Sequence, residues 1–138
     1  MRNKLRVVVD TNVLVSAALF SSSLPGQALS HAINHGCLLM SANTASELRT
    51  VLFRPRLSRY LHSEEATEFL ASVLRYAEPV EITVSIAICR DPKDDKFLEL
   101  AVSGQASHIV SGDQDILALH PFRGIPVMSP RNFSEIVT

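Results

Sequence analysis

Short apolar runs alternate with longer amphipathic stretches along the 138 residues. This alternation is typical of parallel strands joined by helical crossovers, so it predicts an α/β domain. Right-handed crossovers place helices on both faces of such a sheet, which favours a doubly wound sheet. Hydrophobic residues make up 46% of the sequence, enough for the core of a single domain over residues 1–138. The expected strands are Leu5–Val9, Cys37–Met40, Val80–Val84, His108–Val110 and Ile125–Met128.

Prolines, glycines and cap-forming residues set the bounds of the expected helices. Residues 12–20 are expected to run from a loop into a helix, and a second helix begins at Pro25-Gly26 and stops at Gly36. A third helix is expected at Thr44–Phe53, and a fourth is capped by Ser63, runs through Ala77 and is broken by Pro79. A fifth begins at Asp94 or Asp95, and a sixth is expected at Asp113–Leu119. A terminal helix has Pro130 in its first turn.

The charge balance limits how the protein meets nucleic acid. A formal net charge of -1 argues against a protein that coats nucleic acid through bulk electrostatics. A local basic patch is still present, because Arg49, Arg54 and Arg56 lie close together in the sequence. These three arginines are candidate RNA phosphate contacts, and ordinary solvated surface explains them equally well.

The sequence favours a cytoplasmic protein. Residues 1–6 are basic but lead directly into VVVD, without the apolar stretch of a signal peptide. No apolar run is long enough to span a bilayer, so no membrane contact is expected. Cys37 and Cys89 are flanked by apolar residues, which suits buried thiols in a reducing compartment better than a disulfide or a zinc site.

Carboxylates follow the expected strands or begin the expected helices. Asp10 and Asp113 each come directly after an apolar run, and Glu47 and the Asp94/Asp95 pair lie in helix-starting segments. The carboxyl ends of parallel strands share one crevice, which would bring these acids together if the first and fourth strands are neighbours. Acids in one crevice repel unless a cation neutralises them, and Mg²⁺ or Mn²⁺ prefers oxygen ligands. The pattern therefore predicts a metal-dependent enzyme that cleaves phosphodiester bonds.

Two of these acids have competing structural explanations. Asp10-Thr11-Asn12 matches a helix cap, but three polar residues after three valines favour metal ligation by Asp10, with Thr11 or Asn12 orienting it. Glu47 and Thr44 have the spacing of a capping box, and spacing alone favours that cap over a functional role.

The two later acid segments each contain a choice. Asp94 shares the inward face of its helix with Phe97, so Asp94 is favoured over Asp95 as the ligand, and the other aspartate caps the helix. Gly112 permits a turn that exposes the carboxylate of Asp113, which is assigned to ligation. Asp115 lies in the first turn of the following helix, where it has a supporting or capping role.

Several other enzyme classes lack their motifs. His31 and His35 are four residues apart, but Ala32 stands where a zinc protease has its glutamate. The sequence contains no GxSxG, Walker A or GxGxxG motif. A dehalogenase-type phosphotransferase needs an aspartate at Asn12, and a response-regulator receiver needs one at Ser85.

The ordered acid segments resemble the PIN-domain ribonucleases, and most closely the VapC-like branch of toxin components of toxin–antitoxin systems. The resemblance spans most of the chain, from Val7 to Leu119. The matching segments are VVVDTNVLVSA, SELRTVLFRPRL, RDPKDDKFLELA and IVSGDQDILAL.

This resemblance implies a three-layer α/β/α fold with a five-stranded parallel sheet. It also implies endonucleolytic cleavage of single-stranded RNA with Mg²⁺ or Mn²⁺, a cognate antitoxin protein and a homodimer. Asn12 and Ser111 match polar helpers of the family, and Ala101, seven residues after Asp94, again selects Asp94. The alternative is a catalytically inactive PIN-like module that acts through protein or RNA contacts. The implied ligands are Asp10, Glu47, Asp94 or Asp95, and Asp113.

Overall fold

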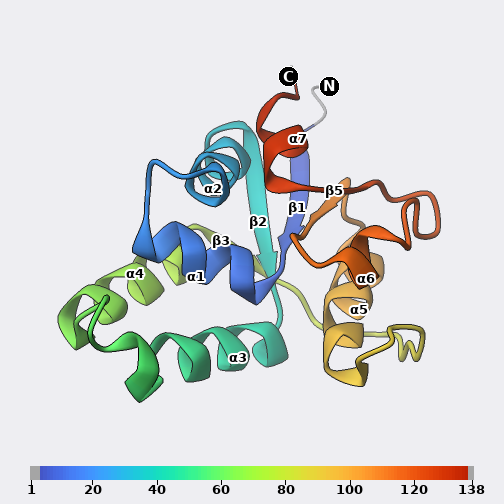
Figure 1. The fold of residues 1–138 in the computed structure, drawn as a ribbon. Helices are drawn as coiled ribbons and strands as arrows, with labels where there is room; N and C mark the ends of the chain where they lie inside the picture. The colour runs from blue at the N-terminus through green and yellow to red at the C-terminus, as the bar shows by residue number, and fades with distance from the viewer. Residues whose placement is uncertain (1–3, 137–138) are drawn as a thin grey trace.

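A five-stranded parallel sheet forms the centre of the protein in a computed structural model that describes residues 4–136 (Figure 1). The strand order is β3-β2-β1-β4-β5, and every paired neighbour runs parallel. This arrangement confirms the predicted five-stranded parallel sheet. The strands are β1 (Leu5–Val9), β2 (Gly36–Met40), β3 (Ala77–Pro79), β4 (His108–Val110) and β5 (Val127–Met128).

Helices cover both faces of the sheet, so the fold has three layers. The α-helices are α1 (Thr11–Leu19), α2 (Leu24–His35), α3 (Ala42–Leu52), α4 (Ser63–Tyr76), α5 (Asp95–Ser103), α6 (Gln114–Leu117) and α7 (Pro130–Ser134). Two 3₁₀ turns, η1 (Pro55–Leu57) and η2 (Pro92–Asp94), precede α4 and α5. Figure 1 shows α1 to α4 on one side of the sheet and α5 and α6 on the other.

The central strand β1 divides the apolar core into two parts. Val7 and Val9 pack into the cluster formed with α1 to α4 and α7, whereas Val8 packs into the cluster formed with α5 and α6. Successive side chains of a strand point to opposite faces, so an uninterrupted valine run serves both clusters. The same alternation recurs in β2, where Leu38 and Leu39 enter different clusters.

The prediction of a third strand at Val80–Val84 is wrong. The strand is Ala77–Pro79, directly after α4, and residues 80–84 are not part of a strand. Pro79 is compatible with this strand because β3 is an edge strand, and the neighbouring Val80 N–H donates to the Met40 carbonyl oxygen at 2.8 Å. Val80, Ile82 and Val84 all pack against the core cluster on the α5 side of the sheet, and this explains the strand-like alternation of the segment.

Smaller differences concern helix ends and cysteines. Ser63 is the first residue of α4 rather than its cap, which is His62, and the helix ends at Tyr76. Cys37 and Cys89 are free thiols, as predicted, but both are only partly buried. Within residues 4–136, no single helix is long and apolar enough to cross a membrane; α1 and α2 pass that test only together, bent by 106°.

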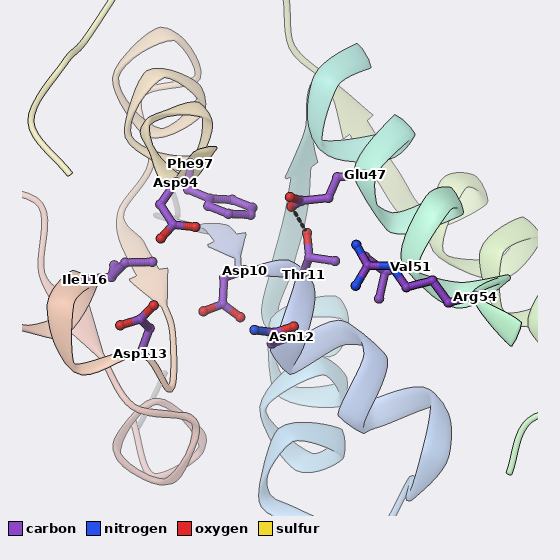
Figure 2. Close-up of a pocket in the computed structure, with 10 residues that line it drawn as sticks. All are labelled: Asp10, Thr11, Asn12, Glu47, Val51, Arg54, Asp94, Phe97, Asp113 and Ile116. Atoms are coloured by element: carbon purple, nitrogen blue, oxygen red, sulfur yellow. Dashed lines mark hydrogen bonds between the residues drawn. The ribbon is translucent and has the colours of Figure 1, made fainter. Parts of the chain in front are cut away.

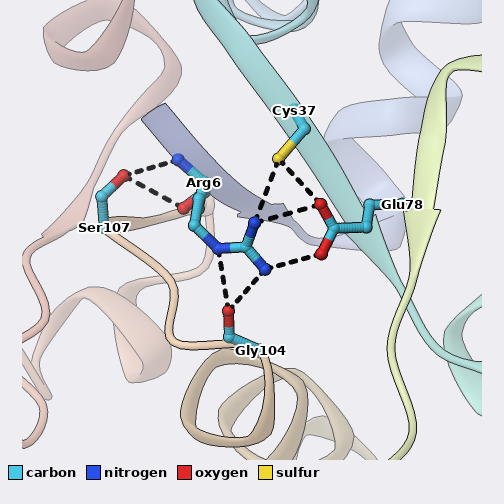
Figure 3. Close-up of polar contacts among 5 residues, drawn as sticks. All are labelled: Arg6, Cys37, Glu78, Gly104 and Ser107. Atoms are coloured by element: carbon cyan, nitrogen blue, oxygen red, sulfur yellow. Dashed lines mark hydrogen bonds and ion pairs between the residues drawn. The ribbon is translucent and has the colours of Figure 1, made fainter. Parts of the chain in front are cut away.

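Arg6 joins three elements near the start of the sheet (Figure 3). Its guanidinium contacts both carboxylate oxygens of Glu78 on β3, at 3.0 and 2.7 Å. Nε and Nη2 also donate to the carbonyl oxygen of Gly104, at 3.0 and 2.9 Å, where α5 ends. The backbone of Arg6 exchanges hydrogen bonds with the hydroxyl of Ser107. One side chain therefore fixes β3 and the carboxyl end of α5 relative to β1.

Replacing Arg6 by lysine removes the paired contact with Glu78. We expect Arg6→Lys to lower the free energy of unfolding near neutral pH, because lysine cannot bond both carboxylate oxygens of Glu78 at once. The loss should be only about 1 kcal/mol, because both side chains are partly exposed and water screens the pair. The Arg6 hydrogen bonds hold the pKa of Glu78 below its ordinary value. The loss is therefore present above the unfolded-state pKa and fades as pH falls through the folded-state pKa. Urea denaturation between about pH 7 and about pH 3 measures it.

Arg75→Lys is the matched control, since Arg75 is exposed at the end of α4. An equal loss of stability in both variants would contradict the role given to Arg6.

Candidate functional site

The neighbouring strands β1 and β4 bring two acids together, as predicted. Asp10 follows β1 directly and caps α1, and Asp113 follows β4 closely and caps α6. The Asp10 N–H donates to the carbonyl oxygen of Val110 at 3.0 Å, which extends the β1–β4 pairing to the site. The strand order reverses between these strands, so their carboxyl ends form the crevice where α/β proteins bind ligands.

Asp10 is the most constrained acid of the site. Its side chain is 5% exposed; Oδ1 accepts from the Val13 N–H at 2.9 Å, and Oδ2 accepts from the Ser111 hydroxyl. Burial raises the pKa of Asp10, and these hydrogen bonds partly oppose the shift. Ser111 is fully buried and also accepts from the Asp113 N–H at 3.0 Å. Ser111 therefore connects the two acids across the strand boundary.

The four predicted acid segments meet at one pocket of about 140 Å³ (Figure 2). In Figure 2, three aspartates gather on one side, and Glu47 lies opposite them beside Thr11. The acids come from the ends of β1 and β4 and from the segments that contain α3 and η2. The pocket is lined by Asp10, Thr11, Asn12, Glu47, Val51, Arg54, Asp94, Phe97, Asp113 and Ile116.

Glu47 faces this pocket and does not cap its helix. The cap of α3 is Ser41, and the capping box pairs Ser41 with Thr44, so the expected box between Thr44 and Glu47 is wrong. Glu47 lies in the second turn of α3, where Oε1 accepts from the Thr11 hydroxyl. Oε2 pairs with the ammonium group of Lys96 at 3.0 Å. Thr11 therefore orients Glu47 and not Asp10, contrary to the expectation for Thr11, and Val13 and Ser111 hold Asp10.

The adjacent aspartates Asp94 and Asp95 have different surroundings. Asp94 lines the pocket, and its side chain forms no cap hydrogen bond although it precedes α5. Asp95 is 9% exposed and lies outside the pocket lining, where Oδ1 accepts from the backbone N–H groups of Ile88 and Cys89 at 3.1 and 2.8 Å. Asp95 thus holds the irregular segment that leads to the site.

The pocket is electrostatically costly without a cation. Burial is the main cause that raises the pKa of Asp94 from 3.8 to about 6. Nearby carboxylates raise it further, first Asp91 and then the pocket acids Asp113, Asp10 and Glu47. A carboxyl whose pKa is raised in the folded state destabilises the fold in its charged form. The geometry therefore concentrates negative charge that a positive ligand would relieve.

The supporting residues divide by position. Asn12 lines the pocket, and the backbone N–H of Asp115 donates to Asp113 at 2.8 Å, while Asp115 itself is exposed. Arg49, Arg54 and Arg56 are all exposed, and of the three only Arg54 lines the pocket. Figure 2 shows the guanidinium of Arg54 pointing toward Asn12 and Thr11.

Lys96 is the site residue that the sequence reasoning missed. Its ammonium reaches Glu47 from the first turn of α5, next to the predicted acid pair. Its position directly after Asp94-Asp95 in DPKDDKF could have indicated a role near the acids. A lysine near the start of a helix is usually exposed to solvent, so the sequence alone gave no reason to select it.

A family model described as PIN domain matches residues 6–115, which is most of the chain. The chain belongs to the PIN domain family. An uncharacterized protein of Methanocaldococcus jannaschii is 28% identical over 120 residues, covering 84% of this chain and 76% of that protein. PIN domains are generally nucleases, and PIN nucleases generally depend on divalent metals, so the family supports a hydrolase activity.

A solved structure matches the fold of this PIN domain. It is the crystal structure of VapBC2 from Rickettsia felis bound to a DNA fragment from their promoter. The match has a TM-score of 0.62 and 12% sequence identity, and it covers 91% of this chain and 98% of that chain. At this identity the likeness establishes the α/β fold.

Opposite stability changes are expected for the adjacent aspartates in metal-free buffer. Asp94→Asn should raise the free energy of unfolding by about 1 kcal/mol above about pH 6, because it removes a charge that the fold disfavours. Asp95→Asn should lower it by about 1 kcal/mol, because the hydrogen bonds of Cys89 and Ile88 favour the charged form of Asp95.

Urea denaturation with EDTA measures both changes. The Asp94 effect should vanish as pH falls below the unfolded-state pKa, since the carboxyl is then neutral in both states. Changes of the same sign in the two variants would contradict this assignment.

Proposed function

We propose that this PIN domain is a metal-dependent endoribonuclease that hydrolyses phosphodiester bonds of single-stranded RNA. The observation that carries the proposal is the convergence of Asp10, Glu47, Asp94 and Asp113 on one pocket at the switch point of the sheet. A phosphodiester is itself anionic, so acids alone would repel it. A divalent cation resolves this conflict, because it binds both the carboxylates and a phosphate oxygen.

The chemistry of the donor set fits Mg²⁺ or Mn²⁺. All four acids offer oxygen atoms, and burial together with the charge of nearby carboxylates raises the pKa of Asp94. Their spacing is not that of a complete ligand set, because residues 4–136 contain no group of three or more His, Cys, Asp or Glu side chains placed to hold a metal ion. The proposed ligands are therefore these four acids after local rearrangement, without Asp95.

When bound, the cation supplies a Lewis acid for the phosphate and a water with a lowered pKa. The protein residues prepare the site for this chemistry. The hydroxyl of Ser111 and the N–H of Val13 orient Asp10, and the hydroxyl of Thr11 orients Glu47. Arg54 is the proposed phosphate contact, since it is the candidate arginine that lines the pocket.

A second hollow supports a single-stranded substrate. It has a volume of about 350 Å³ and shares Asp10, Asn12 and Asp113 with the acidic pocket. A base next to the reacting phosphate would enter this hollow only if it were unpaired, because a base within a duplex stays stacked. The remaining lining residues are Val13, Ser16, Pro25, Gly112 and Pro130.

The biological setting is part of the proposal. The likeness to a chain of the VapBC2 structure supports a toxin role with a cognate antitoxin protein. A homodimer and a cytoplasmic location stay predictions from the sequence.

The nuclease proposal predicts cleavage of a mixed-sequence single-stranded RNA with Mn²⁺ and none with EDTA. Asp10→Asn should lower the rate by at least about 100-fold, because Asp10 is the proposed ligand with the most fixed orientation. Glu68→Gln is the control, since Glu68 is exposed on α4 and lies outside the pocket lining. Gel analysis of cleavage products measures the rates.

Equal cleavage by wild type and Asp10→Asn would show a contaminant, and metal binding without cleavage of any RNA would favour the inactive binding module. The toxin role is tested with the same variant in cells. Expression of the wild type should arrest growth, and Asp10→Asn should relieve the arrest.

The second hollow predicts a graded steric effect at Gly112. A Cβ built at Gly112 meets no heavy atom within 4 Å, so larger side chains would fill the hollow without displacing the backbone. We expect Gly112→Ala to have little effect and Gly112→Leu to lower kcat/KM for single-stranded RNA about tenfold. Mn²⁺ affinity should stay unchanged, which isothermal titration checks. Full activity of Gly112→Leu would place the substrate elsewhere.

A further inference from the structure

The ion pair between Lys96 and Glu47 joins α5 to α3, and of its two members Glu47 lines the acidic pocket. Nζ of Lys96 lies 3.0 Å from Oε2 of Glu47, and the two side chains are 22% and 24% exposed. Partial burial makes this pair stronger than an exposed surface pair, because the surrounding dielectric is lower than that of water. The pair is therefore less screened by solvent than an ion pair on the open surface.

This contact leaves both carboxylate oxygens of Glu47 engaged. Thr11 donates to Oε1, and Lys96 holds Oε2. A divalent cation on the same carboxylate would lie close to the ammonium group, and the two positive charges would repel each other. Glu47 cannot favourably serve both cations at once.

The arrangement of the four acids agrees with this conflict. Glu47 lies opposite the aspartates in Figure 2, beside Thr11. No group of three acids within residues 4–136 is placed to hold a metal ion. A ligand set that includes Glu47 needs movement of these acids, and the ion pair with Lys96 restrains Glu47.

We propose that Lys96 is a tethered counter-ion of the acidic pocket, which holds Glu47 in the metal-free protein and competes with the divalent cation for it. This inference rests on the proposed metal-dependent function. Lys96 neutralises part of the acidic charge before metal arrives, and it weakens metal binding for the same reason. Lys96 is thus a positioning residue that acts through Glu47.

The test is the affinity for Mn²⁺ alone, measured by isothermal titration calorimetry on the full chain. Lys96→Met removes the competing charge, so Mn²⁺ should bind about tenfold more tightly. Lys93→Met is the matched control, because Lys93 is exposed three residues earlier and its loss changes the net charge equally. We expect less than about a threefold change for Lys93→Met.

A double-mutant cycle identifies the residue through which Lys96 acts. In a Glu47→Gln background, Lys96→Met should no longer tighten Mn²⁺ binding, because the carboxylate for which the cations compete is absent. Lys96→Gln provides a second neutral variant if Lys96→Met does not fold, and it should tighten binding similarly. Circular dichroism confirms the fold of each variant.

The outcomes separate this inference from the proposed function. Mn²⁺ binding by the wild type that is unchanged or weaker in folded Lys96→Met and Lys96→Gln would overturn the competition and leave the metal-dependent nuclease standing. Equal tightening with and without Glu47 would overturn the pairing with Glu47. No Mn²⁺ binding by any folded variant would overturn both proposals. Binding that becomes detectable only after loss of Lys96 would support the competition.

Discussion

The pairing of β1 with β4 is the constraint on which the site depends. It aligns the carboxyl ends of two neighbouring strands, and the Asp10 N–H continues that pairing to the carbonyl oxygen of Val110. The buried hydroxyl of Ser111 then contacts Asp10 and the backbone of Asp113 together. Two carboxylates that would otherwise separate are therefore held by the backbone of the sheet, and the apolar core on both faces holds the sheet.

The acids of the pocket differ in how far polar contacts stabilise their negative charge. Asp10 is stabilised by hydrogen bonds that oppose its desolvation, Glu47 is stabilised by Thr11 and Lys96, and Asp94 carries a strongly raised pKa. The least compensated acid lies at the start of α5, after an irregular segment anchored by Asp95. A site built in this way stores unfavourable electrostatics that a cation would release.

The sequence was sufficient where the pattern was local and strong. The valine run of β1 predicted a central strand, and the position of Asp10 after it predicted an acid at the sheet edge. The prediction of the third strand failed because Val80–Val84 alternates for packing on one side, while the paired strand β3 ends at Pro79. The orientation of Glu47 and the contact of Lys96 depend on the approach of α3 to α5, which no local pattern encodes.

The edges of the sheet limit how this protein can meet another chain. Pro79 lacks the N–H group that a further strand would need at its position on the β3 edge, and β5, at the other edge, is only two residues long. Neither edge strand therefore offers a long row of free backbone groups, so another chain has little to pair with by adding a strand to this sheet. A partner would have to recognise side chains on the helical layers, where specificity depends on shape and charge.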